Sequence, residues 1–192
     1  MDTQRLLDFL SQAEQLKHRT RHNIGEDGRR ESVAEHCWRA ALMALLLEPE
    51  HPEIDCRRVM ELCLVHDLGE AITGDIPTFR KTEEDEQREE RAVEQLLELL
   101  EPAQRKRLTE LFEELEEGTT PEARLMTAID KAEAVLSHNE APISTWEDHE
   151  YQLQRTHGIR EAAAASPAMA ELRRAILEQT EDKIRKEGCG HV

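Results

Sequence analysis

A histidine followed directly by an aspartate, His66-Asp67, stands at the end of an apolar helical run and is the clearest sign of chemistry in the chain. Imidazole nitrogens and carboxylate oxygens both bind divalent metal ions. His36 upstream and Asp130 downstream offer one more ligand of each kind. Glu70 follows one helical turn after the pair, so its carboxylate is expected near the same pocket. These residues predict a site for one divalent ion, with Glu70 left over for proton transfer.

Each of these residues could also have an ordinary structural role without a metal ion. A histidine next to an aspartate is common, and the pair alone indicates a metal site only rarely. Three ionisable side chains at a helix end surrounded by apolar residues are harder to explain, because unpaired buried charge is costly and a divalent cation compensates carboxylates. His36 could instead be a hydrogen-bonded helix residue, and Asp130 could be an ion-pair partner of Lys131 or Arg124.

The mixture of ligand types bears on which ion would bind. Imidazole and carboxylate together suit Mn, Co, Ni, Zn or Fe better than Ca, which prefers oxygen ligands alone. We therefore expect a transition metal, whose identity the residues leave open.

The elements that must position these side chains are predicted to be helices. Apolar residues make up 38% of the chain and aromatic residues only 3%, so the core must consist mainly of aliphatic residues that helices accept. No run of alternating apolar and polar residues is convincing as a strand. A chain of 192 residues is ordinarily one domain. We predict an all-α fold in a single domain, 1–192.

Caps and breakers divide the chain into its expected helices. SVAE at 32–35 fits a capping box, and the glycine and proline within 73–77 end a helix. The arginine-rich segment 17–30, with two glycines, is predicted to be a loop. The expected helices span residues 2–17, 32–48, 55–73, 82–100, 102–118, 120–135, 145–157 and 167–187.

A formal charge of −17 excludes polymeric nucleic acid as the expected partner, because such binding needs a basic surface. The acidic segment 82–117 is interpreted as a solvated helical surface. No segment approaches the roughly 20 apolar residues of a membrane span, so we expect no membrane contact and a cytoplasmic location. The four cysteines form no CxxC pair and are expected to be reduced: Cys37, Cys56, Cys63 and Cys189. Three of them fall on apolar helical positions.

The order of the four ligand residues resembles the signature of the HD-domain metal-dependent phosphohydrolases. The surrounding segments are similar to the bacterial 5′-deoxynucleotidase branch of that family: ESVAEH at 31–36, HDLGEAITGDIP at 66–77 and TAIDKAEA at 127–134. The resemblance covers about residues 5–155. It implies a compact bundle of orthogonally packed helices, with the helix 167–187 added at the C-terminus. It also implies a homodimer that removes phosphate from nucleoside 5′-monophosphates by metal-assisted hydrolysis.

The resemblance implies a role for each matching residue. The ligands of the metal ion would be His36, His66, Asp67 and Asp130. Glu70 would act as general acid or base, Asp75 would help to position substrate and water, and Arg19 would contact the phosphate. Members of the wider superfamily that bind two metals carry extra histidines between the second and third ligand segments. None of the nine histidines here lies in that interval, which favours a single ion.

One departure from the family pattern concerns the sugar. Relatives with established deoxynucleotide selectivity carry a tryptophan beside or near the phosphate-contacting arginine, whereas Thr20, Arg21 and His22 stand here. His22 could replace this aromatic contact with the substrate, or it could be exposed. Arg19 and Asp75 could likewise be an ordinary surface arginine and loop acid. The preference for base and sugar stays open.

Three functions in different classes remain possible at this point. The first is hydrolysis of nucleoside 5′-monophosphates. The second is hydrolysis of another nucleotide on the same scaffold, such as a di- or triphosphate or an alarmone. The third is a non-catalytic metal-binding or helical interaction module that uses the acidic segment 82–117. Glu70 argues against the third, because a structural metal site needs no spare carboxylate beside it.

Overall fold

The structure is a computed structural model that describes residues 2–25 and 27–188, most of them helical. The first elements are α1 (Thr3–Ala13), β1 (Thr20–Ile24), β2 (Arg30–Ser32), α2 (Val33–Leu47), α3 (Cys56–Val65), α4 (Glu70–Thr73) and α5 (Glu83–Glu98). They are followed by α6 (Pro102–Glu117), α7 (Pro121–Glu140), α8 (Glu150–Thr156), α9 (Ile159–Ala165) and α10 (Pro167–Glu187). Short 3₁₀ turns lie at Glu14–Lys17, Glu48–Glu50 and Ile143–Thr145. The predicted all-α class is confirmed.

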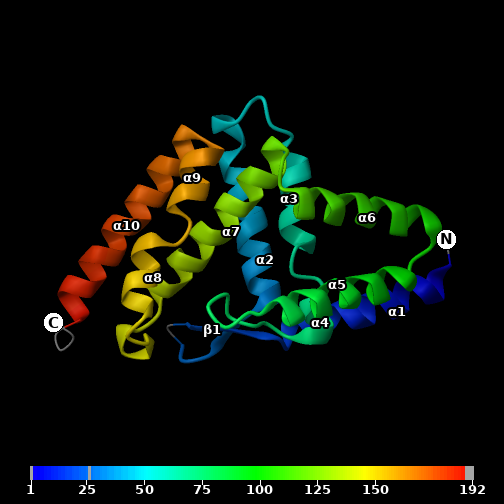
Figure 1. Ribbon diagram of the computed structural model, residues 1–192, viewed down its shortest axis with the longest axis horizontal. Coiled ribbons are helices and arrows are strands. Elements are labelled where there is room, and N and C mark those ends of the chain that lie inside the picture. Colours follow the sequence, from blue (N-terminus) through cyan, green and yellow to red (C-terminus); the bar gives the residue numbers. More distant parts are fainter. Residues whose placement is uncertain (1, 26, 189–192) are drawn as a thin grey trace.

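The helices α2, α3 and α7 form the centre of the bundle. They lie between the group α8 to α10 on one side and the group α1, α5 and α6 on the other (Figure 1). The axes of α2 and α3 run crosswise to those of α5 and α6 (Figure 1). Their facing surfaces are apolar and buried, with Ala40, Leu62, Leu125 and Ile129 fully enclosed. Burial of this aliphatic surface is the main stabilising contribution to the fold, and it holds the three helices that carry the predicted ligands.

The start of α2 is a capping box, as the sequence predicts. The Ser32 hydroxyl accepts a hydrogen bond from the amide of Glu35 at 3.3 Å, and the Glu35 carboxylate accepts one from the amide of Ser32 at 2.8 Å. Both bonds satisfy amides that a helix start leaves without partners. The cap sets the position of the first turn, in which His36 points inward and is completely buried.

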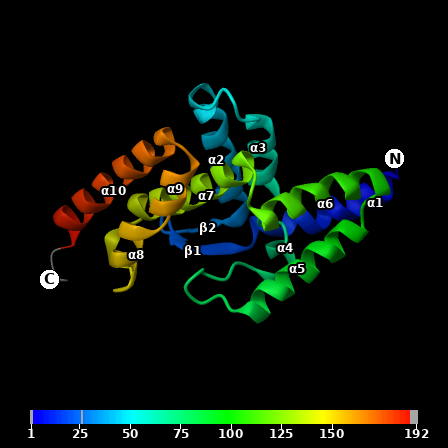
Figure 2. The ribbon, with the colours of Figure 1, turned by 45° about the horizontal axis from the view of Figure 1, so that its top comes forward.

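The prediction that residues 17–30 form a loop is wrong, because β1 pairs with β2 as an antiparallel hairpin, in which Thr20 faces Ser32. A turn containing Gly28, whose φ is 78°, joins the two strands. The buried residues of the hairpin are polar, Asn23 and Ser32. A strand of this kind shows no apolar alternation, and so its sequence gives no strand signal. The hairpin lies against the end of the α2 and α7 pair (Figure 2).

The helix expected over 55–73 is interrupted. α3 ends at Val65, and tight turns follow, in which the amide of Leu68 donates to Val65 O at 2.9 Å and that of Glu70 donates to Asp67 O at 3.0 Å. α4 then begins at Glu70. The ligand pair therefore projects from a helix end rather than from the middle of a long helix.

The helix expected over 145–157 begins later, at Glu150, and α9 was not expected at all. Gly158, with a φ of 75°, separates α8 from α9. A positive φ suits glycine and ends a regular helix.

Two further predictions concern the cysteines and membranes. Cys37, Cys56 and Cys63 are free and buried, while Cys189 lies outside the described residues. Among the helices that the structure describes, none has both the length and the apolar composition to cross a membrane.

Candidate metal centre

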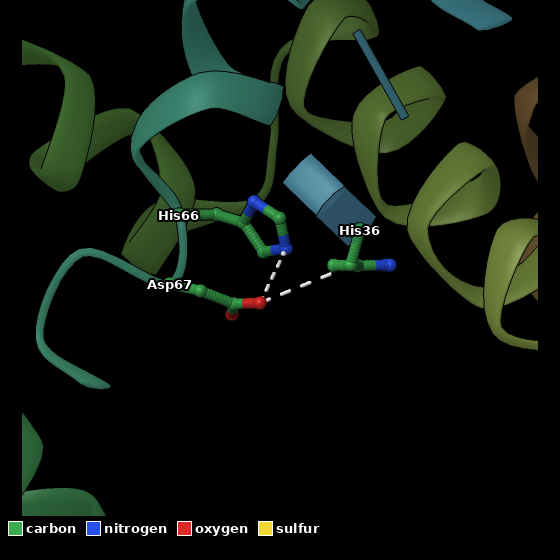
Figure 3. A group of neighbouring side chains, drawn as sticks. All are labelled: His36, His66 and Asp67. Carbon is green, nitrogen blue, oxygen red and sulfur yellow. Dashed lines mark ion pairs between the residues drawn. The ribbon is translucent and has the colours of Figure 1, made fainter. Parts of the chain in front are cut away.

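All four predicted ligands meet between α2, the end of α3 and α7. His36 Nε2 lies 3.0 Å from Asp130 Oδ1, and His66 Nε2 lies 3.1 Å from Asp67 Oδ2. The crossed pairs, His36 with Asp67 and His66 with Asp130, are each 3.8 Å apart. Figure 3 shows the Asp67 carboxylate facing both imidazoles. The ligand atoms of His36, His66 and Asp67 thus all lie within 4.8 Å of one another, and Asp130 Oδ1 lies within 3.8 Å of both imidazoles.

The second ring nitrogen of each histidine is already occupied. His36 Nδ1 contacts the carboxylate of Glu133, and His66 Nδ1 lies 2.9 Å from the carbonyl oxygen of Cys63. Acceptors at Nδ1 favour the tautomer whose Nε2 lone pair faces the cluster. Both Nε2 atoms are buried and have no hydrogen-bond partner among the described residues. Buried polar atoms are rarely left so, and a divalent cation fits this donor set.

Charges within the cluster keep the aspartates ionised. Burial would raise the pKa of Asp67, but the facing His66 and His36 and nearby Arg21 hold it at about 2. Burial likewise opposes ionisation of Asp130, yet the facing imidazoles of His36 and His66 keep its pKa well below the usual value. Both side chains are carboxylates at neutral pH, which is the form that binds metal.

Glu70 lies beside this cluster and differs from the two aspartates in its protonation state. It is 6% exposed, and its Oε2 is buried without a hydrogen-bond partner among the residues described. Burial, together with the negative charges of Asp67, Asp75 and Glu89, raises the pKa of Glu70 to about 9. Glu70 is therefore protonated at neutral pH in the protein alone, and a carboxyl group in this state can serve as a general acid. Asp75 has a raised pKa as well, mainly through burial.

A cavity of about 600 Å³, open mouth included, adjoins the centre. Its walls come from β1, α7, α8 and the loop that follows α4. They include Arg21, His22, Asp75, Phe79 and Gln154. The guanidinium of Arg21 stands between cavity and cluster, because its Nη1 lies 3.7 Å from Asp67 Oδ2 and its Nε lies 3.6 Å from Glu31 Oε2. The sequence does not single out Arg21, since the resemblance directs attention to Arg19.

Arg19 has a different environment. Its Nε and Nη2 donate to the carbonyl oxygen of Ala71 at 3.1 and 3.0 Å, and Nη2 also reaches that of Ile72 at 3.4 Å. It is absent from the residues that line the cavity. In this structure Arg19 fastens α4 to the start of the hairpin, and its contact with phosphate stays a prediction.

His22 and Asp75, the other expected substrate contacts, both line the cavity. The His22 ring meets the Phe79 ring edge to face at a centroid distance of 5.9 Å, and Phe79 in turn packs on His149 at 4.3 Å. His22 Nε2 is buried, 3.5 Å from carboxylate oxygens of Glu147 and Glu150. His22 and Phe79 therefore give the cavity an aromatic wall.

Comparison with known proteins gives four consistent findings. A family model described as HD domain matches residues 13–172. The Bos taurus protein named 5′-deoxynucleotidase HDDC2 is 35% identical in an alignment of 177 residues that covers 90% of this chain and 83% of that protein. A crystal structure from Magnetospirillum magnetotacticum MS-1, described as a predicted metal-dependent phosphohydrolase, is 28% identical with a TM-score of 0.79 and covers 93% and 92% of the two chains. The cyanophage S-2L HD phosphohydrolase, bound to dA and one catalytic Zn²⁺ ion, is 26% identical with a TM-score of 0.58 over 92% and 96%.

Proposed function

Because this chain belongs to the HD-domain family of metal-dependent phosphohydrolases, we propose that it hydrolyses the phosphate ester of nucleoside 5′-monophosphates, deoxynucleotides among them. One observation carries the proposal: the four-ligand cluster opens beside a cavity, and Arg21 stands at their junction. The name of the bovine relative supports the same substrate class.

The donor set fits one divalent transition metal ion, Mn, Co, Ni, Zn or Fe, held by His36, His66, Asp67 and Asp130. When bound, such an ion supplies Lewis-acid chemistry, which polarises a phosphoryl oxygen and makes water a better nucleophile near neutral pH. The zinc ion in the cyanophage structure is consistent with this choice.

Residues around the metal site would bind the phosphate, supply a proton and orient the substrate. Arg21 is a cation that lines the cavity, with 17% of its side chain exposed, and a guanidinium suits bidentate binding of a phosphate. Glu70 holds a proton that the leaving 5′-oxygen needs when the ester bond breaks. Asp75 lines the cavity and interacts electrostatically with both Arg21 and Glu70, and it would orient substrate and water.

The cavity beyond Arg21 would hold the nucleoside. Phe79 and His22 offer aromatic surface for a sugar or base. Among the described residues, Asn23 Oδ1 and His22 Nε2 are buried without hydrogen-bond partners. Polar atoms in this state favour a ligand with hydrogen-bonding edges, such as a nucleoside, over an apolar one.

The experiment that tests this function is phosphate release from a panel of nucleoside mono-, di- and triphosphates in ribo and deoxy forms. Metal-stripped protein would be supplemented in turn with Mn, Co, Ni, Zn or Mg. We expect metal-dependent orthophosphate release from the monophosphates. Pyrophosphate or triphosphate release from longer nucleotides alone would reject the monophosphate assignment and favour the second function considered from the sequence.

Arg21→Ala is expected to raise KM for the monophosphate by about tenfold or more, because charge-assisted hydrogen bonds to a phosphate contribute roughly 1.5–3 kcal/mol. Arg19→Ala serves as the matched comparison, since it removes the same side chain two residues away. It should lower the melting temperature through lost contacts with α4 while leaving KM nearly unchanged. If Arg19→Ala raised KM and Arg21→Ala left it nearly unchanged, the phosphate contact would be assigned to Arg19 instead.

Three further points belong to the proposal. We propose that residues 1–192 act as one HD domain, that two copies associate as a homodimer, and that the protein works in the cytoplasm. Size-exclusion chromatography with light scattering would decide the second point, with a single-chain mass contradicting it.

A further inference from the structure

One buried polar network joins the metal ligand His36 to the phosphate-binding Arg21. We propose that Ser137 is a positioning residue for both, because its hydroxyl links the carboxylate that orients His36 to the carboxylate that faces Arg21. The inference rests on the proposed function, which assigns His36 to the metal ion and Arg21 to the phosphate.

The first arm of the network leads to the metal centre. Glu133 is completely buried, and one of its oxygens contacts His36 Nδ1. Its other oxygen accepts a hydrogen bond from Arg39 Nε at 2.7 Å and lies 3.1 Å from the Ser137 hydroxyl. A carboxylate held at both oxygens cannot turn, so it fixes the plane and the tautomer of the His36 ring.

The second arm leads to the cavity. The Ser137 hydroxyl lies 3.0 Å from Glu31 Oε1, and Glu31 Oε2 lies 3.6 Å from Arg21 Nε. Glu31 is largely buried, with 13% of its side chain exposed. At this distance the Glu31 carboxylate attracts the Arg21 guanidinium by charge but forms no short hydrogen bond with it. The N–H groups of the guanidinium therefore stay free to bind a phosphate.

Ser137 is the one described residue whose side chain contacts both carboxylates. It lies one turn after Glu133 and two turns after Asp130, on the same face of α7. Its oxygen also accepts a hydrogen bond from Arg39 Nη2. A hydroxyl has a single hydrogen to donate, so the two arms compete for it and are coupled through it. Removing the hydroxyl takes this shared donor from the two carboxylates and leaves Arg39 Nη2 short of an acceptor.

The experiment compares Ser137→Ala with Thr127→Ala, both made in the wild type and in an Arg21→Lys background. Thr127 is the matched control, because its hydroxyl lies on the same helix and donates only to Ala123 O of that helix, at 2.9 Å. The readouts are KM for a nucleoside monophosphate, the dissociation constant of Co²⁺ or Zn²⁺ from competition with a chromophoric chelator, and the melting temperature.

Ser137→Ala is expected to raise both KM and the metal dissociation constant by about two- to tenfold, the range that one buried hydrogen bond supplies. In the Arg21→Lys background it should raise the metal dissociation constant as before but leave KM unchanged, since lysine lacks the Nε that Glu31 faces. Glu133→Gln should weaken metal binding more, by about 10- to 100-fold.

Several results would overturn the proposal. If Ser137→Ala and Thr127→Ala agree in KM and in metal affinity, the hydroxyl is merely structural. If KM rises equally in both backgrounds, Ser137 does not act through Arg21. A wild-type protein that releases no phosphate from any monophosphate would reject the proposed function and the Arg21 arm with it, whereas the dissociation constants would still decide the metal arm.

Discussion

Glu70→Gln is expected to lower kcat for phosphate release by about 10²- to 10⁴-fold, the usual contribution of a positioned proton donor or acceptor. The amide keeps the size and most of the shape of the carboxyl group, so KM and metal affinity should change little. Glutamine cannot give up or take a proton, and the leaving 5′-oxygen then has no acid nearby. Steady-state kinetics at saturating metal measures the effect, and a variant with wild-type kcat would reject the role.

The same substitution is expected to stabilise the metal-free protein. The pKa of Glu70 is about 9 in the folded chain and near 4.5 in an ordinary environment. Below about pH 4.5 both states hold the proton, so the group has no effect on stability. Between these pH values the unfolded chain releases a proton that the folded chain retains, and the free energy of unfolding therefore falls as pH rises. Glutamine removes this penalty.

Melting temperatures of the metal-stripped proteins at pH 5 and pH 8 would measure this second effect. The advantage of Glu70→Gln over the wild type should be larger at pH 8. Glu94→Gln, an exposed position on α5, is the matched control and should give no such difference. Loss of activity together with a gain in stability is the pattern expected of a catalytic group whose environment costs the folded protein stability. Equal melting temperatures at both pH values would contradict the raised pKa.

The sequence predicts the helical bundle, and the approach of the four candidate ligands within it, for a shared physical reason. The four ligands sit on or directly after helices whose starts carry strong signals, such as the capping box before His36. Their convergence requires only that three apolar helices pack together, and the aliphatic pattern of α2, α3 and α7 specifies that packing.

The cavity side of the site could not be predicted in the same way. Its wall is a hairpin whose buried residues are polar, so hydrophobic periodicity says nothing about its strands. Which arginine faces the cavity depends on the exact pairing of those strands, and a shift by one residue turns every side chain to the other face. Phe79 lies in a loop, where no helix or strand pattern predicts direction. The coupling through Ser137 depends on contacts among residues up to 106 positions apart.

Asp67→Ala is expected to abolish metal-dependent turnover and, unlike Glu70→Gln, to abolish metal binding as well. Asp67 Oδ2 faces both imidazoles, at 3.1 Å from His66 and 3.8 Å from His36, so its removal takes an oxygen from the centre of the cluster. The loss of affinity should exceed the roughly 10- to 100-fold effect of removing a group that only orients a ligand. Exposed Asp8 on α1 provides the matched control as Asp8→Ala.

Thermal denaturation separates these two roles without any need for turnover. An ion present at 100 times its dissociation constant stabilises the folded state by about 2.7 kcal/mol, which for a chain of this size raises the melting temperature by roughly 5–10 °C. Wild type, Asp8→Ala and Glu70→Gln should all show this rise with Zn²⁺ or Co²⁺, and Asp67→Ala should not. If Asp67→Ala kept the full rise, the ion would be bound elsewhere. If Glu70→Gln lost it, Glu70 would be a ligand rather than the proton donor, because a residue that only moves a proton has no reason to change the affinity for the ion.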